Sequence, residues 1–221
     1  MITIKAKDIT INEVHKLLKF QEVTNINTFT TWLSLEPLTE VEQQELAQIQ
    51  QDFWAYLSRG KVLEGLVKAL TTFPLMRLAG FYRSPIALSL EQHIADTIVE
   101  DEDTTITGQL DIVAVNKEQP LRDETFFWVL VIEAKNSSIT TYMGLPQLLT
   151  YAYQSLERQA SVWGLATNGV HYQFAYLDRD RGNGPTYELM PELNLMDAER
   201  SPLLLQVLKA ICKLHNSVIA N

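Results

Sequence analysis

The sequence predicts an α/β fold in which a mixed β-sheet core is flanked by helices. Residues 126–132 form a continuous run of large apolar residues, rich in aromatic and β-branched types, which is typical of a strand covered on both faces. Residues 108–115 have a similar pattern with one charge near the start. The full order of expected elements is helix, three strands, helix and two strands, which fits a sheet packed between helices.

Two helices are expected in the first 58 residues. Thr10 and Glu13 have the spacing of a capping box, and so do Thr39 and Glu42. After the second box, apolar residues recur on one helical face at Leu46, Ile49, Phe53 and Leu57. We interpret residues 1–58 as a helical extension that packs on the core.

A further helix is expected over residues 61–70. Its buried stripe would comprise Leu63, Val67 and Leu70. Pro74 and the Gly80-Phe81-Tyr82 region are expected to end this helical section, because proline removes a backbone donor and disfavours a helix interior. A strand over residues 105–115 should follow.

The second half of the chain contains one more helix between strands. Pro146 suits the first turn of a helix that runs to about residue 159. Its polar residues, among them Gln147 and Tyr151, share one face, and its leucines share the other. Strands are expected on both sides of a tight turn at Asn168 and Gly169, over residues 161–166 and 171–177. A last amphipathic helix begins at Pro202.

Length and composition agree with a single domain over residues 1–221. A chain of 221 residues can bury one sizeable core, which we place at residues 59–180, with a C-terminal loop and helix over 181–221. The single cysteine, Cys212, permits no internal disulfide and suits an apolar helix as a packed thiol. The chain lacks the apolar core of a signal peptide and any run near the roughly 20 apolar residues of a membrane span. We therefore expect a cytoplasmic protein without membrane contact.

Three charged residues interrupt the apolar strands. Asp111 lies near the start of the first strand, and Glu133 and Lys135 lie at the end of the second, where alternation places them on the same face. The midpoint between Asp111 and Glu133 falls at residue 122, inside a short polar connection, so a simple hairpin would bring the two carboxylates together. Like charges at that distance destabilise each other unless a cation lies between them.

These residues resemble the PD-(D/E)xK nuclease core. Asp111 precedes Glu133-Ala134-Lys135 on the next strand, and Gln147-x-x-x-Tyr151 follows on a helix. The Gln-x-x-x-Tyr addition is similar to the nuclease domain of type I restriction enzyme R subunits and to exonucleases of the RecB kind. The resemblance covers about residues 60–180 and implies a restriction-endonuclease-like fold. Leu110 stands where the family name has proline, a substitution that the family tolerates.

The resemblance implies a role for each residue. Asp111, Glu133 and the carbonyl of Ala134 would hold Mg²⁺ or Mn²⁺, and Lys135 would stabilise the transition state or help to activate water. Gln147 and Tyr151 would support the site or contact nucleic acid. Structural alternatives are a Glu133–Lys135 salt bridge, carboxylates that only end strands in solvent, and a helix whose polar face is merely solvated.

A further acid often lies upstream in this family, and two residues are candidates. Glu64 falls on the expected helix 61–70, and Glu91 falls on the extended segment that follows. Glu64 could equally form a surface pair with Lys68, four residues later.

The function that the resemblance implies is a Mg²⁺-dependent DNA phosphodiesterase. The net charge of −9 argues against a protein that coats nucleic acid electrostatically, and it implies weak DNA affinity without a partner. Other subunits of a restriction system are possible partners, as is a second copy in a homodimer. The chain contains no P-loop pattern, so any motor would be on another polypeptide. The alternative is a non-catalytic nucleic-acid-binding or assembly subunit that retains the nuclease fold.

Overall fold

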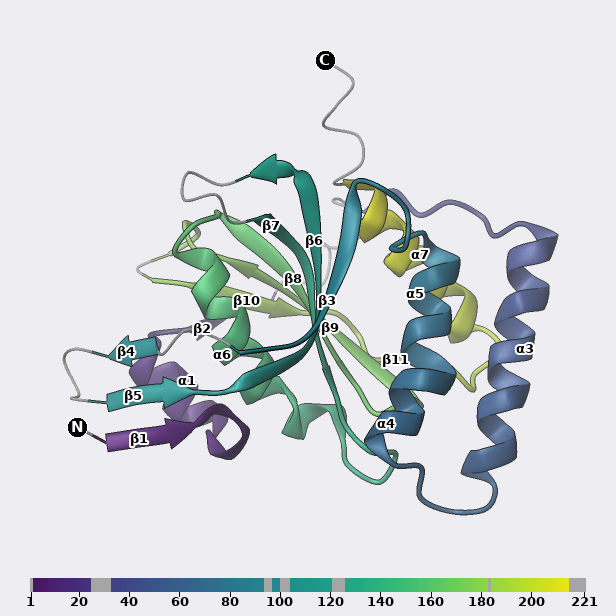
Figure 1. Cartoon of the computed structure of the whole chain (residues 1–221), viewed down its shortest axis with the longest axis horizontal. Helices are drawn as coiled ribbons and strands as arrows, with labels where there is room; N and C mark the ends of the chain where they lie inside the picture. Colours follow the sequence, from purple (N-terminus) through teal and green to yellow (C-terminus); the bar gives the residue numbers. More distant parts are fainter. Residues whose placement is uncertain are drawn as a thin grey trace.

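The centre of the protein is an eight-stranded mixed sheet with helices on both faces (Figure 1). The structure is a computed structural model that describes residues 2–24, 33–93, 97–99, 104–120, 126–182 and 184–214. The strand order is β2-β10-β9-β8-β7-β6-β3, and β11 pairs with β9 beside this path. The strands are β2 (Gln21–Glu22), β3 (Ile86–His93), β6 (Gln109–Pro120), β7 (Phe126–Ala134), β8 (Ser161–Thr167), β9 (His171–Asp178), β10 (Thr186–Leu189) and β11 (Leu193–Asn194). The predicted α/β class with a mixed sheet is confirmed.

The helices pack against the two faces of the sheet through two apolar cores. On one face lie α3 (Glu40–Leu57), α4 (Glu64–Val67), α5 (Phe73–Ala79) and α7 (Arg200–Leu214). On the other face lie α1 (Ile11–Leu17) and α6 (Leu145–Leu156). Alternation along each strand supplies both cores: Ile132 packs toward the first and Val131 toward the second. Cys212 is buried in the first core, as expected.

The register of β6 and β7 is the one that the hairpin midpoint predicts. Ile112 lies opposite Ile132, and Val113 lies opposite Val131. Continued by one residue, this register brings Asp111 level with Glu133. A bulge follows between Ala114 and Val115, and residues 121–125 of the connection lie outside the described part of the chain.

Both predicted capping boxes are present. The amide of Thr10 donates to Glu13 Oε2 at 2.8 Å, and the amide of Glu13 donates back to Thr10 Oγ1 at 3.3 Å. Thr39 and Glu42 make the same reciprocal pair at the start of α3. The expectation that residues 1–58 are helical was incomplete, because this segment also contains β2 and the strand β1 (Ile2–Lys5).

The strand expected over residues 105–115 is divided at Gly108. Its first part, β5 (Thr104–Thr107), leaves the main sheet and joins β1 and β4 (Thr97–Val99) in a separate three-stranded sheet. A Cβ at Gly108 would lie 2.9 Å from both Ala6 Cβ and Tyr151 Cε1, closer than carbon atoms approach. The absence of a side chain therefore lets the chain pass between the N-terminal segment and α6.

The helical section runs through Pro74 instead of ending there. A π-helical turn, η2 (Lys68–Thr72), joins α4 to α5, and the amide of Phe73 donates to the carbonyl of Lys68, five residues back. This wider turn accommodates Pro74, which has no amide proton to continue the α-helical pattern. Gly80, with a φ of 102°, ends the helix, so the end expected at residues 80–82 is confirmed and the break at Pro74 is not.

Two further differences from the sequence predictions arise from packing. Leu63 precedes α4 and is 62% exposed, so it is not part of the buried stripe, whereas Val67 is fully buried. Strands β10 and β11 were not predicted, because each is short and has neighbours on β9 that only the fold brings close.

Among the described helices, none is long and apolar enough to cross a membrane.

The turn between β8 and β9 yields a test of packing. We expect Gly169→Ala to lower the free energy of unfolding by about 1–3 kcal/mol. Gly169 has a φ of 87°, and a Cβ there would lie 2.7 Å from Phe53 Cζ. Gly65→Ala, in α4, is the control, since a Cβ there meets no atom within 4 Å. It should be neutral or stabilising by up to about 1 kcal/mol, and urea unfolding would measure both. Equal effects of the two changes would contradict this account.

Candidate active site

Asp111, near the start of β6, is held by two elements at once. The backbone amide of Ala134 donates to its Oδ2 at 2.8 Å. Nζ of Lys68, on the π-helical turn, lies 3.0 Å from its Oδ1. The Asp111 side chain is 16% exposed, so the carboxylate faces a small opening and not bulk solvent.

Glu133, near the end of β7, is a buried carboxyl group with an incomplete set of partners. Its side chain is 2% exposed, and its Oε1 lies 2.5 Å from Lys135 Nζ. Its Oε2 is buried and accepts no hydrogen bond from any group in the described part of the chain. Burial, reinforced by the charge of Asp111, raises the pKa of Glu133 to about 8, although Lys135 opposes the shift. The Glu133–Lys135 salt bridge, which was the structural alternative for Lys135, is present, and it leaves one oxygen of the Glu133 carboxylate without a partner among the described residues.

Gln147 and Tyr151, on α6, extend this pair into a hydrogen-bonded chain. Lys135 Nζ donates to Gln147 Oε1 at 2.8 Å, and Gln147 Nε2 donates to Tyr151 Oη at 2.7 Å. The alternative of a merely solvated polar face is wrong here, because Gln147 is 8% exposed and Tyr151 is 1% exposed. Since Gln147 contacts Lys135 directly, its side chain determines where the ammonium group lies.

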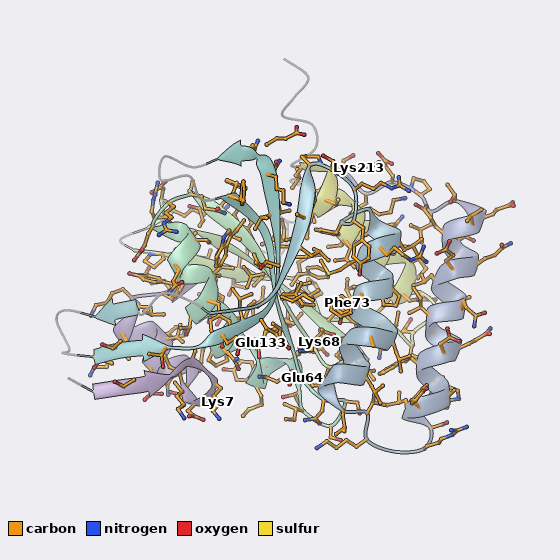
Figure 2. All side chains as sticks on the ribbon, viewed as in Figure 1. Lys7, Glu64, Lys68, Phe73, Glu133 and Lys213 are labelled. Carbon is orange, nitrogen blue, oxygen red and sulfur yellow. The ribbon has the colours of Figure 1, made fainter. Side chains whose placement is uncertain are left out.

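Of the two upstream acids, Glu64 is the one that the structure connects to Asp111. Lys68 Nζ lies 3.2 Å from Glu64 Oε1 as well as 3.0 Å from Asp111 Oδ1, so the expected i,i+4 pair is also a bridge to the site. Figure 2 shows Glu64, Lys68 and Glu133 together beside α4. Glu91 lies on β3 at the level of Asp111, but its backbone has a φ of 50° and its side chain is exposed.

Lys68 was not predicted as a site residue. Its side chain is 15% exposed, and burial alone would lower its pKa, but the charges and hydrogen bonds of Asp111 and Glu64 outweigh burial and raise that pKa. The only signal in the sequence was its position four residues after Glu64. The contact with Asp111, 43 positions away, depends on how the π-helical turn packs against the sheet.

The residues present fit a divalent cation. Asp111 and Glu133 offer carboxylate oxygens, and Mg²⁺ is commonly bound by one or two carboxylates together with water. Ala134, the last residue of β7, is the predicted source of a backbone oxygen. In the described ranges no group of three or more His, Cys, Asp or Glu side chains is arranged to hold a metal. The unpartnered Oε2 of Glu133 is the feature that a cation would satisfy.

Comparison with known proteins adds no assignment. No protein-family model matches the chain, and no curated protein matches it significantly.

Lys68 should compete with a metal for Asp111. We expect Lys68→Met to raise the affinity for Mn²⁺ about tenfold, because the change removes a positive charge next to a ligand oxygen. Lys209→Met is the matched control: its side chain is also 15% exposed and pairs with Glu42, away from the site. Both changes should lower the melting temperature, but only the first should alter Mn²⁺ binding in a calorimetric titration. Equal Mn²⁺ affinities in the two variants would refute the competition.

The raised pKa of Glu133 predicts a pH dependence of stability. Without metal, the folded protein holds a proton at pH values between about 4.5 and 8 that the unfolded chain releases. This contribution is full below the unfolded pKa and is lost as pH rises through the folded pKa, with a slope of at most about 1.4 kcal/mol per pH unit.

Glu133→Gln should therefore flatten the fall in stability from pH 5 to pH 8, measured by urea unfolding in EDTA. Saturating Mn²⁺ should flatten it in the wild type as well, since a bound cation favours the ionised carboxylate. A wild type and a Glu133→Gln variant with parallel curves would show that Glu133 does not carry the shift.

Proposed function

We propose that this protein is a Mg²⁺-dependent DNA phosphodiesterase with a restriction-endonuclease-like fold, similar to the nuclease domain of type I restriction enzyme R subunits. The observation that carries the proposal is the buried, unpartnered Oε2 of Glu133 beside Asp111. A buried carboxylate without a full set of partners is costly unless it serves a ligand. The chain from Lys135 through Gln147 to Tyr151 supports the same conclusion.

Each residue has a distinct task in this proposal. Asp111, Glu133 and the carbonyl of Ala134 would hold the ion, which would polarise the scissile phosphate and lower the pKa of the attacking water. Lys135, held by Glu133 and Gln147, would donate to a phosphate oxygen as negative charge develops there. Gln147 positions Lys135, and Tyr151 fixes the amide orientation of Gln147. Glu64 would hold the ammonium group of Lys68 if a bound ion took over its position at Asp111.

The charge balance favours a protein that binds DNA weakly by itself and more tightly together with a partner protein. The net charge is −9, and the two lysines at the site are already paired with acids. Weak electrostatic attraction would follow for the protein alone, so a DNA-binding partner of a restriction system is a further part of this proposal. The acidic net charge also agrees with a second candidate function, that of a non-catalytic subunit that retains the fold.

Metal-dependent cleavage tests the proposal. The purified protein should cut DNA in Mg²⁺ or Mn²⁺ and lose this activity in EDTA. Asp111→Asn should abolish cleavage and Mn²⁺ binding, whereas Lys135→Met should lower the rate by at least about 100-fold while retaining Mn²⁺ binding. No cleavage by a folded protein that binds Mn²⁺ would favour the non-catalytic subunit.

Two substitutions on α6, each of which removes one tyrosine hydroxyl, separate a role in the active site from an effect on the stability of the helix. Tyr151→Phe removes the partner of Gln147 and should slow cleavage about tenfold or more, because Lys135 loses its fixed position. Tyr153→Phe removes the same group two residues away, where the ring packs edge-on against Phe20, and should leave the rate unchanged. Equal rates in the two variants would make α6 a scaffold only.

A further inference from the structure

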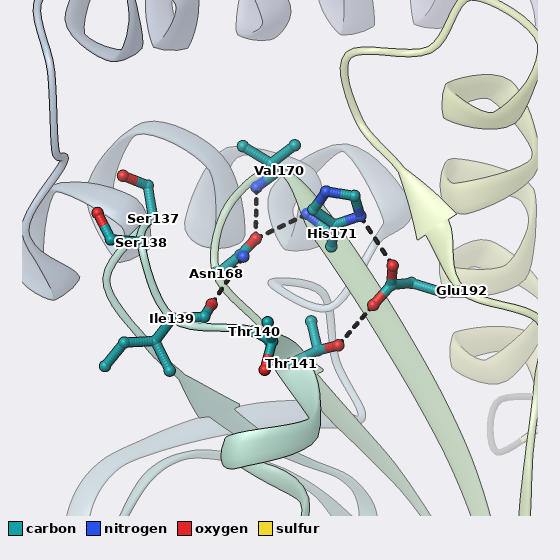
Figure 3. A pocket seen from close by; sticks show the side chains of 9 residues that line it. All are labelled: Ser137, Ser138, Ile139, Thr140, Thr141, Asn168, Val170, His171 and Glu192. Atoms are coloured by element: carbon teal, nitrogen blue, oxygen red, sulfur yellow. Dashed lines mark hydrogen bonds and ion pairs between the residues drawn. The ribbon is translucent and has the colours of Figure 1, made fainter.

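A polar cavity of about 350 Å³ lies at the same end of the sheet as the candidate active site (Figure 3). One wall is the loop that follows β7, with the hydroxyl side chains Ser137, Ser138, Thr140 and Thr141. The opposite wall comes from the β8–β9 turn and from Glu192, which precedes β11. This volume is within the range of small-ligand sites in proteins.

A hydrogen-bonded chain orients one imidazole in this cavity. His171 Nδ1 lies 2.8 Å from Glu192 Oε1, and Thr141 Oγ1 donates to Glu192 Oε2 at 2.5 Å. Both oxygens of Glu192 are therefore engaged, and the proton of a neutral His171 is held on Nδ1. Nε2 is left to accept a hydrogen bond from a ligand. The side chains of His171 and Glu192 are 41% and 40% exposed, so a ligand can reach them.

The frame of the cavity is fixed before any ligand enters. Asn168 Nδ2 donates to the carbonyl of Ile139 at 2.8 Å, and its Oδ1 accepts from the amides of Val170 and His171 at 3.0 and 2.8 Å. The Ser137 side chain accepts from the amide of Val62 at 2.8 Å, which ties the loop to the segment before α4. A rigid cavity loses little entropy when it binds a ligand.

Hydrogen bonds join the backbone of Lys135 to the wall of the cavity. The amide of Lys135 donates to the carbonyl of Thr167 at 2.7 Å, and Thr167 Oγ1 donates to the carbonyl of His171 at 2.9 Å. Ser137, on the wall formed by the loop after β7, follows Lys135 by two residues, a chain distance of about 7 Å at most. A strand whose phosphate lies at Lys135 would place an adjoining nucleotide at the cavity.

The lining selects a neutral planar ligand over a phosphate. Among the nine residues that line the cavity within the described chain, none is Lys or Arg, and Glu192 is acidic. Two aliphatic side chains, Ile139 and Val170, are partly exposed there and provide apolar surface. Hydroxyl groups and an oriented imidazole beside an apolar wall match the edge and face of a nucleobase.

We propose that this cavity is a base-binding subsite, which receives one nucleobase and its sugar from a single nucleic-acid strand held at the candidate active site. The proposal rests on the proposed function for the choice of ligand. It names the substrate class at this point as single-stranded or locally unpaired nucleic acid, because a paired base cannot present its edge to a cavity of this kind.

Binding of matched oligonucleotides in EDTA, where cleavage cannot proceed, tests the subsite. The probes are a fluorescent single strand of about 12 nucleotides and an abasic strand of the same length, which keeps the phosphates but lacks bases. By fluorescence anisotropy, the wild type should bind the intact strand about tenfold more tightly than the abasic strand. His171→Ala should lose this preference, and Glu192→Gln should weaken it.

Arg77→Ala is the control, because Arg77 forms a comparably exposed pair with Glu45 on the helical layer and should leave the preference unchanged. A wild type that binds both strands equally would overturn the subsite, as would an unchanged preference in a folded His171→Ala variant. Displacement of the strand by free nucleoside monophosphates at micromolar concentration would also overturn it, in favour of a small-molecule site. Base-dependent binding without any Mg²⁺-dependent cleavage would retain the subsite and reject the proposed nuclease.

Discussion

The burial of Glu133 near the end of the central strand β7 is the constraint on which the rest of the site depends. A carboxyl group that is 2% exposed loses its hydration, and neighbouring Asp111 adds repulsion. Lys135 Nζ donates a hydrogen bond to one oxygen of Glu133, and the same ammonium group donates a second hydrogen bond to Gln147 Oε1. Gln147 and Tyr151 of α6 are buried where they extend this hydrogen-bonded chain.

The same constraint shapes the elements around the site. Asp111 is neutralised by Lys68, and a π-helical turn brings that lysine over the sheet. Gly108 lacks a side chain where Tyr151 passes, so that the chain can leave the main sheet immediately before Asp111. The loop after Lys135 is pinned by Asn168, and this pinning forms the neighbouring cavity. The candidate active site and the neighbouring cavity would thus share one end of the sheet, at the carboxyl ends of β7 and β8, where α/β proteins commonly bind ligands.

Much of the fold follows from local patterns. Both capping boxes, the strands β7, β8 and β9 and the turn at Gly169 each have a signature within a few residues, and each is present. The pairing of β6 with β7 could also be predicted, because a short connection leaves only one midpoint for a hairpin. That register was enough to bring Asp111 and Glu133 together as candidate ligands.

The sequence by itself determined which residues carry charge at the ends of buried strands and which carry amide and hydroxyl groups on α6. Only the tertiary structure decided that Gln147 and Tyr151 are buried, since helical periodicity cannot distinguish a polar face in water from one against a polar site. It also decided that Lys68 contacts Asp111 and that His171 faces Glu192. These contacts join segments far apart in the chain, and their geometry depends on helix packing and turn conformation that no local pattern specifies.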